Sequence, residues 1–449
     1  MSEQGPVRRR LEAALARIDA LNPTYRALVS VAAERARAEA DHGDARRRAG
    51  IWGGPLDGVI VVAKDNIDEA GLRTAAGSRL FADYVPDEDA FVLRRVRKAG
   101  GIVIGKASMM ELALGLRSLD AIAGQCRNPW AEDRVPGGSS GGSACAVALD
   151  FCQAALGTDT GGSVRMPAAF CGVTGLRPTH GRVSNDGVRP VSVSLDTVGP
   201  LARDVGDVAR LYAVIAGYDP RDPHSRRRGV EDWTRDRSAD VAGLKIGLPR
   251  HFYRDDLDPE IAGAVAAVAR HFEAAGATLV EIEVPEAERA PEFVSRIILS
   301  DVCALYAKEL AERRADVSDQ VYERMIAGQA LTAVDYAEAL RFREAWARAA
   351  DLRYREQVDA TLIATTPTVA PPIEDNAHLV DATRRATWFT YGGSLAGVPG
   401  ISFPCGFNRD GLPIGALLET RRWREDLLFR LVANWQAGSD WHRRRAAVD

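Results

Sequence analysis

The sequence predicts an α/β fold in which a mixed, mostly parallel central β-sheet is covered by helices and carries a helical insertion. Three observations support this prediction. Short apolar runs alternate with helical patterns from about residue 59 onward. Residues 290–356 are almost wholly helical in pattern, and we expect them to form a cap beside the sheet. No segment has the length or composition of a linker between autonomous domains, and no internal repeat is present.

The first hundred residues give the start of the sheet. Residues 7–48 predict one or two amphipathic helices, because apolar residues recur there at helical spacing. A glycine-proline turn leads into residues 59–63, which are apolar on both faces and therefore predict a central strand. A helix is expected over 90–98 and the next buried strand over 102–104. This β–α–β order predicts parallel pairing.

Two Gly/Ser-rich segments follow, reading GGSSGGSAC at 137–145 and GTDTGGSVRMP at 157–167. A helix is expected over 140–149, a strand over 152–156 and a further helix starting near residue 163. Both segments therefore lie at the ends of buried elements. Backbone N–H groups in such places are free to bind anions.

From about residue 207 the composition changes, beginning with a charged loop at 221–237. Outside the helical stretch already described, this half of the chain predicts strands and helices at 244–248 (strand), 259–275 (helix), 278–282 (strand), 362–364 (strand), 401–403 (strand), 414–418 (strand) and 426–437 (helix).

We predict one domain spanning residues 1–449. Residues 1–206 are expected to form its core with the catalytic residues. Residues from about 207 to 360 are expected to form a variable, largely helical cap region, and residues 361–449 to return to the core.

Composition narrows the class of protein. The net charge of −4 and the pI near 6.1 give no support for nucleic-acid or anionic-membrane binding. No apolar run approaches the ~20 residues of a membrane span, and the N-terminus lacks the apolar region of a signal peptide. The six cysteines show no metal-ligand spacing and predict reduced thiols. These features predict a cytoplasmic protein without a metal site, a nucleic-acid partner or membrane contact. We further expect a small-molecule substrate and a monomer or homodimer.

The chemistry is concentrated in the two Gly/Ser-rich segments and in Lys64, which ends the apolar run of the first predicted strand. Together they supply hydroxyl nucleophiles, backbone that allows close approach, and an amine that can act as a base. This set is sufficient to break an acyl bond without histidine or metal. The chain holds only five lysines against 53 arginines, and of these two residue types only lysine can lose its proton in a protein.

Three other interpretations of the glycine-rich segments stay open. Residues 137–141 satisfy G-x-S-x-G, so Ser139 could be the nucleophile of a Ser-His-Asp α/β-hydrolase. That motif requires a strand directly before it, whereas residues 127–136 are a polar, proline-bounded loop. A phosphate-binding loop would need G-K-[ST] or G-x-G-x-x-G, and neither is present. The segments could also be simple turns, at a cost in conformational entropy.

The segment 137–167 resembles the signature of the amidase signature family. Ser139 follows Lys64 by 75 residues and Ser163 follows Ser139 by 24 residues, a spacing similar to that of the family's Ser-Ser-Lys triad. Further similarity lies in PLDG, GLRPT and LAGVPG, which begin at residues 55, 175 and 395. The resemblance covers almost the whole chain and implies the amidase signature fold.

The resemblance implies a role for each catalytic residue and requires no cofactor. Ser163 is expected to be the nucleophile. Ser139, in a non-proline cis peptide, is expected to relay the proton between Ser163 and Lys64. Lys64 must be neutral to act as the base, so its pKa must fall from about 10.4, and burial shifts it in that direction. An acyl-enzyme forms, the amine leaves with the relayed proton, and water completes hydrolysis.

The resemblance also implies an oxyanion hole formed by the backbone N–H groups of residues 160–163, namely Thr160, Gly161, Gly162 and Ser163. Side chains on the two glycines would keep the substrate carbonyl away. Three further residues match family positions that support the loops by hydrogen bonding: Ser140, Asp159 and Arg165.

The substrate is the least determined part. The family includes glutamine amidotransferase subunits that work on charged tRNA, in which a carboxylate binds the amine of glutamine. That position falls at Thr387 here, which argues against a free amino acid. Trp388, Phe389 and Tyr391 suit an apolar or aromatic group. We therefore expect a broad-specificity aryl amidase (an aryl-acylamidase or urethanase type) that also hydrolyses carbamates. The alternatives are the A-type component of a glutamine amidotransferase and a ureido-acid hydrolase.

Overall fold

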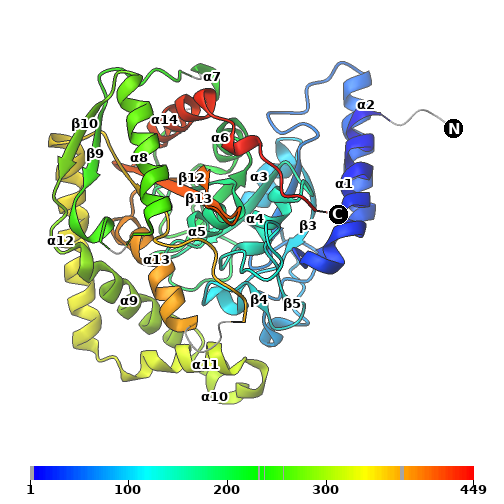
Figure 1. The fold of residues 1–449 in the computed structure, drawn as a ribbon. Coiled ribbons are helices and arrows are strands. Elements are labelled where there is room, and N and C mark those ends of the chain that lie inside the picture. Colours follow the sequence, from blue (N-terminus) through cyan, green and yellow to red (C-terminus); the bar gives the residue numbers. More distant parts are fainter. Residues whose placement is uncertain (1–4, 231–232, 237, 256, 375–378, 449) are drawn as a thin grey trace.

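The computed structural model describes residues 5–230, 233–236, 238–255, 257–374 and 379–448 (Figure 1). Its centre is a sheet of 11 strands in the order β1-β3-β2-β6-β8-β7-β12-β13-β11-β9-β10, with helices around it. The predicted α/β fold with a mixed sheet covered by helices is therefore confirmed. The strands of this sheet are β1 (Leu28–Val31), β2 (Ile60–Lys64), β3 (Ile102–Ala107), β6 (Ala154–Asp159), β7 (Thr174–Arg177), β8 (Thr197–Ala202), β9 (Lys245–Pro249), β10 (Thr278–Ile282), β11 (Ala360–Ala364), β12 (Gly400–Phe407) and β13 (Pro413–Thr420). A separate small sheet pairs β4 (Leu119–Asp120) with β5 (Gly124–Gln125).

Parallel pairing is concentrated in two blocks of the large sheet. On one side β2 pairs in parallel with β3 and β6, and on the other β9 pairs in parallel with β10 and β11. Between these blocks, β8, β7, β12 and β13 are antiparallel to their neighbours, and β1 is antiparallel to β3. The parallel pairing predicted for β2 and β3 is confirmed. The antiparallel centre has a local cause at β12 and β13, because only residues 408–412 join them and so short a connection makes a hairpin.

The first helices match their prediction, with one addition. α1 (Pro6–Tyr25) and α2 (Ala33–Arg48) are the two amphipathic helices expected over 7–48. Between them the chain forms β1, an edge strand that the sequence did not indicate. Four residues are too few to show a period against the helical pattern on both sides.

The elements that carry the Gly/Ser-rich segments lie close to their predicted positions. The helices are α3 (Phe91–Lys98), α4 (Gly141–Ala148) and α5 (Arg165–Cys171). β6 begins two residues later than predicted and extends to Asp159. The second segment therefore starts within the strand and turns only after Asp159.

The second half of the chain adds strands as well as helices. β9 and β10 join the main sheet, so residues between 207 and 360 contribute to it directly. Helix α7 occupies part of the stretch 221–237 that was expected to be loop. The remaining helices outside the cap are α6 (Val205–Ile215), α7 (Trp233–Asp236), α8 (Pro259–Ala274), α13 (Leu379–Ala396) and α14 (Glu425–Gly438). The division of the chain into core, cap and return stays a prediction.

The predicted helical stretch forms α9 (Ala290–Leu305), α10 (Ala307–Glu312), α11 (Asp319–Ile326) and α12 (Ala333–Glu356). These helices gather at one end of the molecule beside α13 (Figure 1). The Phe293 ring of α9 stacks on the Phe342 ring of α12, with centroids 4.1 Å apart. This contact joins α9 to α12, and both helices pack against α13.

The sheet brings the candidate catalytic segments to one edge. Lys64 is the last residue of β2 and Asp159 is the last residue of β6. Because the two strands are parallel neighbours, their carboxyl ends meet at the same edge of the sheet. Among the described residues, no helix is long and apolar enough to cross a membrane.

Candidate active site

Lys64 is fully buried at the end of β2. Its Nζ donates hydrogen bonds to Oγ of Ser139 (2.6 Å) and to Oγ1 of Thr158 (2.8 Å). Burial lowers the pKa of Lys64 to about 7, although the nearby carboxylates of Asp196 and Asp159 oppose the shift. A substantial fraction of this amine is therefore neutral at pH 7, as a proton acceptor must be.

Ser139 is held in place by the backbone of its loop. The peptide bond between Gly138 and Ser139 is cis, as the resemblance implied. The carbonyl oxygen of Ser139 accepts a hydrogen bond from the N–H of Met110 (3.1 Å). The hydroxyl of Ser140 donates to the carbonyl of Thr158 (3.1 Å) and accepts from the N–H of Thr158 (3.2 Å). These bonds attach the loop before α4 to β6 and keep the Ser139 hydroxyl beside Lys64.

Ser163 lies in the turn between β6 and α5 and is partly exposed, whereas Ser139 and Lys64 are fully buried. The N–H of Ser140 donates to the carbonyl of Ser163 (3.2 Å), so the two serine-bearing loops lie side by side. Ser163 lines a small cavity of about 30 Å³. The structure thus brings the three predicted catalytic residues together, with Ser163 on the accessible side. Other residues of the cavity wall are Gly138, Thr160, Gly161, Arg324, Thr387 and Tyr391.

Asp159 organises the turn that carries Ser163. Its carboxylate accepts hydrogen bonds from the N–H groups of Gly162 (2.8 Å) and Val164 (3.1 Å). It also forms ion pairs with Arg165 (3.1 Å) and Arg177 (3.0 Å), all three side chains being fully buried. Burial alone would raise the pKa of Asp159, but the two guanidinium groups hold it well below its ordinary value. Asp159, Arg165 and, on the neighbouring loop, Ser140 therefore hold these loops by hydrogen bonds and ion pairs, and their supporting role in catalysis stays a prediction.

Replacing Asp159 by Asn is expected to lower the free energy of unfolding by about 3–5 kcal/mol, because two buried guanidinium groups lose their shared counter-charge. Equilibrium denaturation in urea measures this change. The matched control is Asp319→Asn, at an exposed ion pair with Arg314, and should change stability by less than about 1 kcal/mol. Equal small effects of the two substitutions would contradict this account of the turn.

The backbone N–H groups expected to form the oxyanion hole are not equivalent. The N–H of Gly162 donates to the Asp159 carboxylate (2.8 Å), so in this structure it is engaged and does not face a substrate oxygen. Among the described residues, no acceptor is recorded for the N–H groups of Thr160, Gly161 and Ser163. The oxyanion hole that remains as a prediction therefore consists of these three groups.

Gly161 and Gly162 are required in this turn because helix α13 packs too closely against it to leave room for side chains. A Cβ on Gly161 would lie 2.5 Å from the ring of Tyr391, and a Cβ on Gly162 would collide with the side chain of Thr390. Gly162 also has a φ of +135°, which disfavours any other residue. The Thr390 hydroxyl donates to the carbonyl of Gly161 (2.6 Å) and so holds α13 against the turn.

Of the three aromatic residues predicted to line the substrate pocket, only Tyr391 does so. Trp388 is half-buried and lines a different cavity, and neither it nor Phe389 lines the Ser163 cavity, so their place in the substrate pocket stays a prediction. Phe389 is fully buried with its ring 5.5 Å from that of Tyr253, and the Trp388 ring lies 5.8 Å from Phe252. Both belong to other faces of α13, since residues that face the turn recur three or four positions apart.

Several residues of the site were not singled out from the sequence. Thr158 bonds Lys64, Asp196 accepts from the Thr160 hydroxyl (2.5 Å), and Arg177 pairs with Asp159. Thr158 lies in the second Gly/Ser-rich segment and Arg177 lies in the GLRPT segment. Because side chains alternate along a strand, the sequence could have placed Thr158 beside Lys64. Arg324, on α11, gave no signal, because its approach to Ser163 depends on how the helical stretch folds back.

The Ser-His-Asp arrangement considered for Ser139 is not present among the described residues. The Ser139 hydroxyl bonds Lys64, and in the part of the chain that the structure describes no histidine hydrogen-bonds Ser139. Residues 127–136 contain no strand, so the Ser-His-Asp motif lacks the element that must precede it. Within the same described ranges, no cluster of histidine, cysteine or acidic residues could hold a metal ion.

Comparison with known proteins agrees with this geometry. The family model described as Amidase matches residues 9–429. The chain belongs to the amidase family. Members of this family hydrolyse carbon–nitrogen bonds, so the chain is an enzyme of that class. Its amidase signature fold recurs in a solved structure described as a vestigial protein complex that reveals the evolutionary origins of an s-triazine catabolic enzyme. The TM-score is 0.92 at 33% identity, with coverage of 96% of this chain and 95% of that one. A peptide amidase solved with the competitive inhibitor chymostatin gives a TM-score of 0.86 at 31% identity, with coverage of 98% and 96%.

Among curated proteins, the chain is 40% identical over 457 aligned residues to the A-type subunit of glutamyl-tRNA(Gln) amidotransferase from Roseiflexus sp. (strain RS-1). The alignment covers 96% of this chain and 93% of that protein. This similarity overturns the prediction of an aryl amidase that also hydrolyses carbamates. One physical reason for the error lies in α13, because Phe389, one of the three aromatic residues behind that prediction, is fully buried in the core.

Proposed function

We propose that the chain is the glutamine-hydrolysing A-type subunit of an amidotransferase, which releases ammonia from the side-chain amide of glutamine. The similarity to a curated subunit of that type, over nearly its full length, supports the proposal. The observation that carries it is Arg324. This residue lines the Ser163 cavity and has no ion pair with any residue that the structure describes. A guanidinium in this place suits the carboxylate of an amino acid whose amide reaches Ser163.

In the proposed mechanism, Ser163 Oγ attacks the amide carbon while its proton passes through Ser139 to Lys64. The carbonyl oxygen becomes an oxyanion that is stabilised by the N–H groups of Thr160, Gly161 and Ser163. The carbon–nitrogen bond then breaks, and the departing nitrogen takes the proton back through the same relay and leaves as ammonia. Water adds to the acyl-enzyme by the reverse path, losing its proton to Lys64, and releases the free carboxylate.

The proposal adds partner chains to the small-molecule substrate predicted from the sequence. The Roseiflexus relative is named as one subunit of an amidotransferase, and the solved structure with a TM-score of 0.92 is described as a vestigial protein complex. Ammonia that is to be transferred must reach an acceptor before it escapes into solvent. We therefore propose that this chain works in a complex with other chains that bind the acceptor, in place of the monomer or homodimer expected from the sequence.

One observation favours a second candidate, a ureido-acid hydrolase. Thr387 occupies the position at which the resemblance places the carboxylate that binds the glutamine amine. Its hydroxyl donates to the carbonyl of Thr383 (2.8 Å), within its own helix. The position therefore offers no negative charge to an ammonium group. A substrate with a carboxylate for Arg324 and a terminal amide, but no ammonium group, fits these residues as well.

The test is ammonia release from three substrates: glutamine, N-carbamoylglycine and the uncharged butyramide. We expect Arg324→Gln to lower kcat/KM for glutamine by about 10–100-fold, through loss of a charge-assisted hydrogen bond, and to leave butyramide hydrolysis unchanged. The control is Glu323→Gln, at an exposed residue of the same helix. Ammonia from N-carbamoylglycine but not from glutamine would select the second candidate. Equal rates for butyramide and both carboxylates would refute the role of Arg324.

A further inference from the structure

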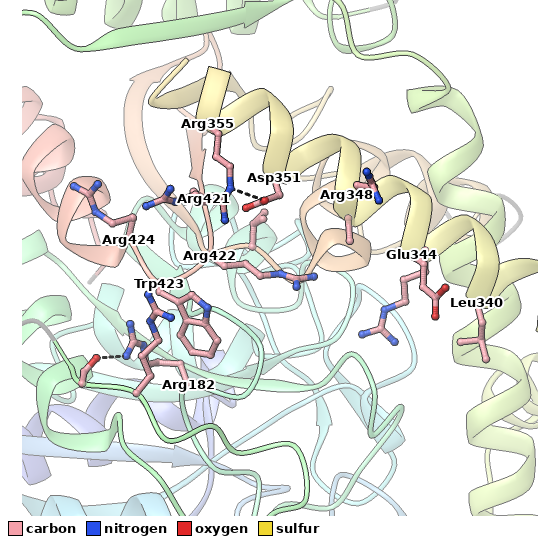
Figure 2. A pocket seen from close by; sticks show the side chains of 15 residues that line it. Arg182, Leu340, Glu344, Arg348, Asp351, Arg355, Arg421, Arg422, Trp423 and Arg424 are labelled. Carbon is pink, nitrogen blue, oxygen red and sulfur yellow. Dashed lines mark hydrogen bonds and ion pairs between the residues drawn. The ribbon is translucent and has the colours of Figure 1, made fainter. Parts of the chain in front are cut away.

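A second cavity, of about 1,040 Å³, lies apart from the Ser163 cavity and shares no wall residue with it. Its wall is formed by helix α12, by the segment after β13, and by separate loop residues at Arg182, at Arg228 and Gly229, and at Val398 (Figure 2). Its wall holds only two acidic residues, Glu344 and Asp351. The basic residues of the wall are all arginines: Arg182, Arg228, Arg343, Arg348, Arg355, Arg421, Arg422 and Arg424.

Most of this positive charge is not neutralised by protein. Three of the arginines have carboxylate partners, since Arg182 pairs with Glu425, Arg424 with Asp426, and Arg355 with Asp351. The other five form no ion pair with any residue in the described ranges: Arg228, Arg343, Arg348, Arg421 and Arg422. The chain as a whole carries a net charge of −4, so this concentration of positive charge is a local feature.

Parts of the wall are held in place by hydrogen bonds. Arg343 Nη2 donates to the carbonyl of Ser194 (2.7 Å), and Arg422 Nε donates to the carbonyl of Ala396 (2.9 Å). Burial lowers the pKa of Arg343 and the neighbouring Arg422 lowers it further, although the carboxylates of Asp301 and Glu344 oppose the shift. The guanidinium groups of Arg343 and Arg422 therefore repel each other, and an anion between them would relieve this electrostatic repulsion.

We propose that this cavity binds an oligophosphate, either inorganic triphosphate or the phosphate chain of a nucleotide. Guanidinium groups present planar pairs of donors that match phosphate oxygens. Five unpaired guanidinium groups on several walls require a ligand with several negative charges in a short length. A single carboxylate or monophosphate would neutralise only part of the wall. The cavity is also of the size that encloses a small molecule.

The experiment is isothermal titration calorimetry on the full chain at physiological ionic strength, with inorganic triphosphate, ATP and monophosphate as ligands. We expect triphosphate to bind at least about tenfold more tightly than monophosphate, because it meets several guanidinium groups at once. Equal affinities for triphosphate and ATP would identify the phosphate chain as the ligand. Tighter binding of ATP would identify a nucleotide. Both results support an oligophosphate site.

The double variant Arg348→Gln/Arg421→Gln is expected to weaken triphosphate binding by about tenfold or more. Arg341→Gln is the matched control, because Arg341 is an exposed residue of α12 outside the cavity wall. Absence of triphosphate binding at millimolar concentration would overturn the proposal, as would unchanged affinity in the double variant. Binding of an RNA oligonucleotide without binding of triphosphate would overturn it too. These readouts do not depend on glutamine hydrolysis, so this proposal and the proposed function can fail separately.

Discussion

Ser163→Ala is expected to lower kcat for amide hydrolysis by about 10⁴-fold or more and to leave thermal unfolding unchanged. The side chain is partly exposed in the turn after β6, and no hydrogen bond of its hydroxyl to a described residue is recorded. Its removal therefore costs little stability, whereas loss of a nucleophile removes the covalent pathway. Steady-state ammonia release and a thermal melt measure the two effects. Ser439→Ala, remote from the cavity, is the control and should retain full activity.

Covalent trapping of the acyl-enzyme tests directly whether Ser163 is the nucleophile. A substrate ester that acylates faster than it deacylates should leave an acyl group on the wild-type enzyme, and peptide mass spectrometry should place that group on Ser163. Ser139 is fully buried beside Lys64, so it should stay unmodified. An acyl group on Ser139, or an active Ser163→Ala variant, would show that the nucleophile has been assigned wrongly.

The sequence predicted those parts of the fold whose signal is local. The run at 59–63 is apolar on both faces, and it forms a central strand of the sheet. Both Gly/Ser-rich segments end at helices, α4 and α5, whose starts were placed within two residues. The proximity of Lys64 to Ser139 was different, because 75 residues separate them and only the family resemblance implied it.

What the sequence did not predict depends on how distant segments meet. β1 is too short to show a period, and the antiparallel centre of the sheet follows from the paths of the connections rather than from the composition of the strands. In α13, three neighbouring aromatic residues looked alike in the sequence. The helix turns only Tyr391 toward the Ser163 cavity, buries Phe389 in the core, and leaves Trp388 half-buried beside Phe252.

Residues that act through charge were missed for the same reason. Arg324 and Ser163 are 161 positions apart, and they line one cavity because α11 folds back toward α13. The arginines of the second cavity come from four separate parts of the chain, and nothing in the sequence indicated that they meet. Whether these arginines are neutralised within the protein depends on which carboxylates lie nearby, and only the folded structure shows this.

Lys64→Arg is expected to lower kcat by about 10³-fold or more although it keeps the positive charge. Arginine cannot lose its proton in a protein, so it cannot accept the proton of Ser163 through Ser139. Since a larger side chain at this buried site can also disturb folding, Lys64→Met provides a second variant without charge and of similar length. Both should be inactive. Lys98→Arg, at an exposed lysine, should behave as the wild type.

The pH dependence of the wild-type enzyme tests the same base without substitution. Burial lowers the pKa of Lys64 to about 7, and only the neutral amine can accept a proton. The neutral fraction grows as pH rises, so kcat/KM should fall about tenfold per pH unit well below pH 7 and reach a plateau above it. A profile that stays flat between about pH 5 and pH 9, or activity that rises on acidification, would exclude a neutral Lys64 as the base, because no other proton acceptor contacts Ser139 among the described residues.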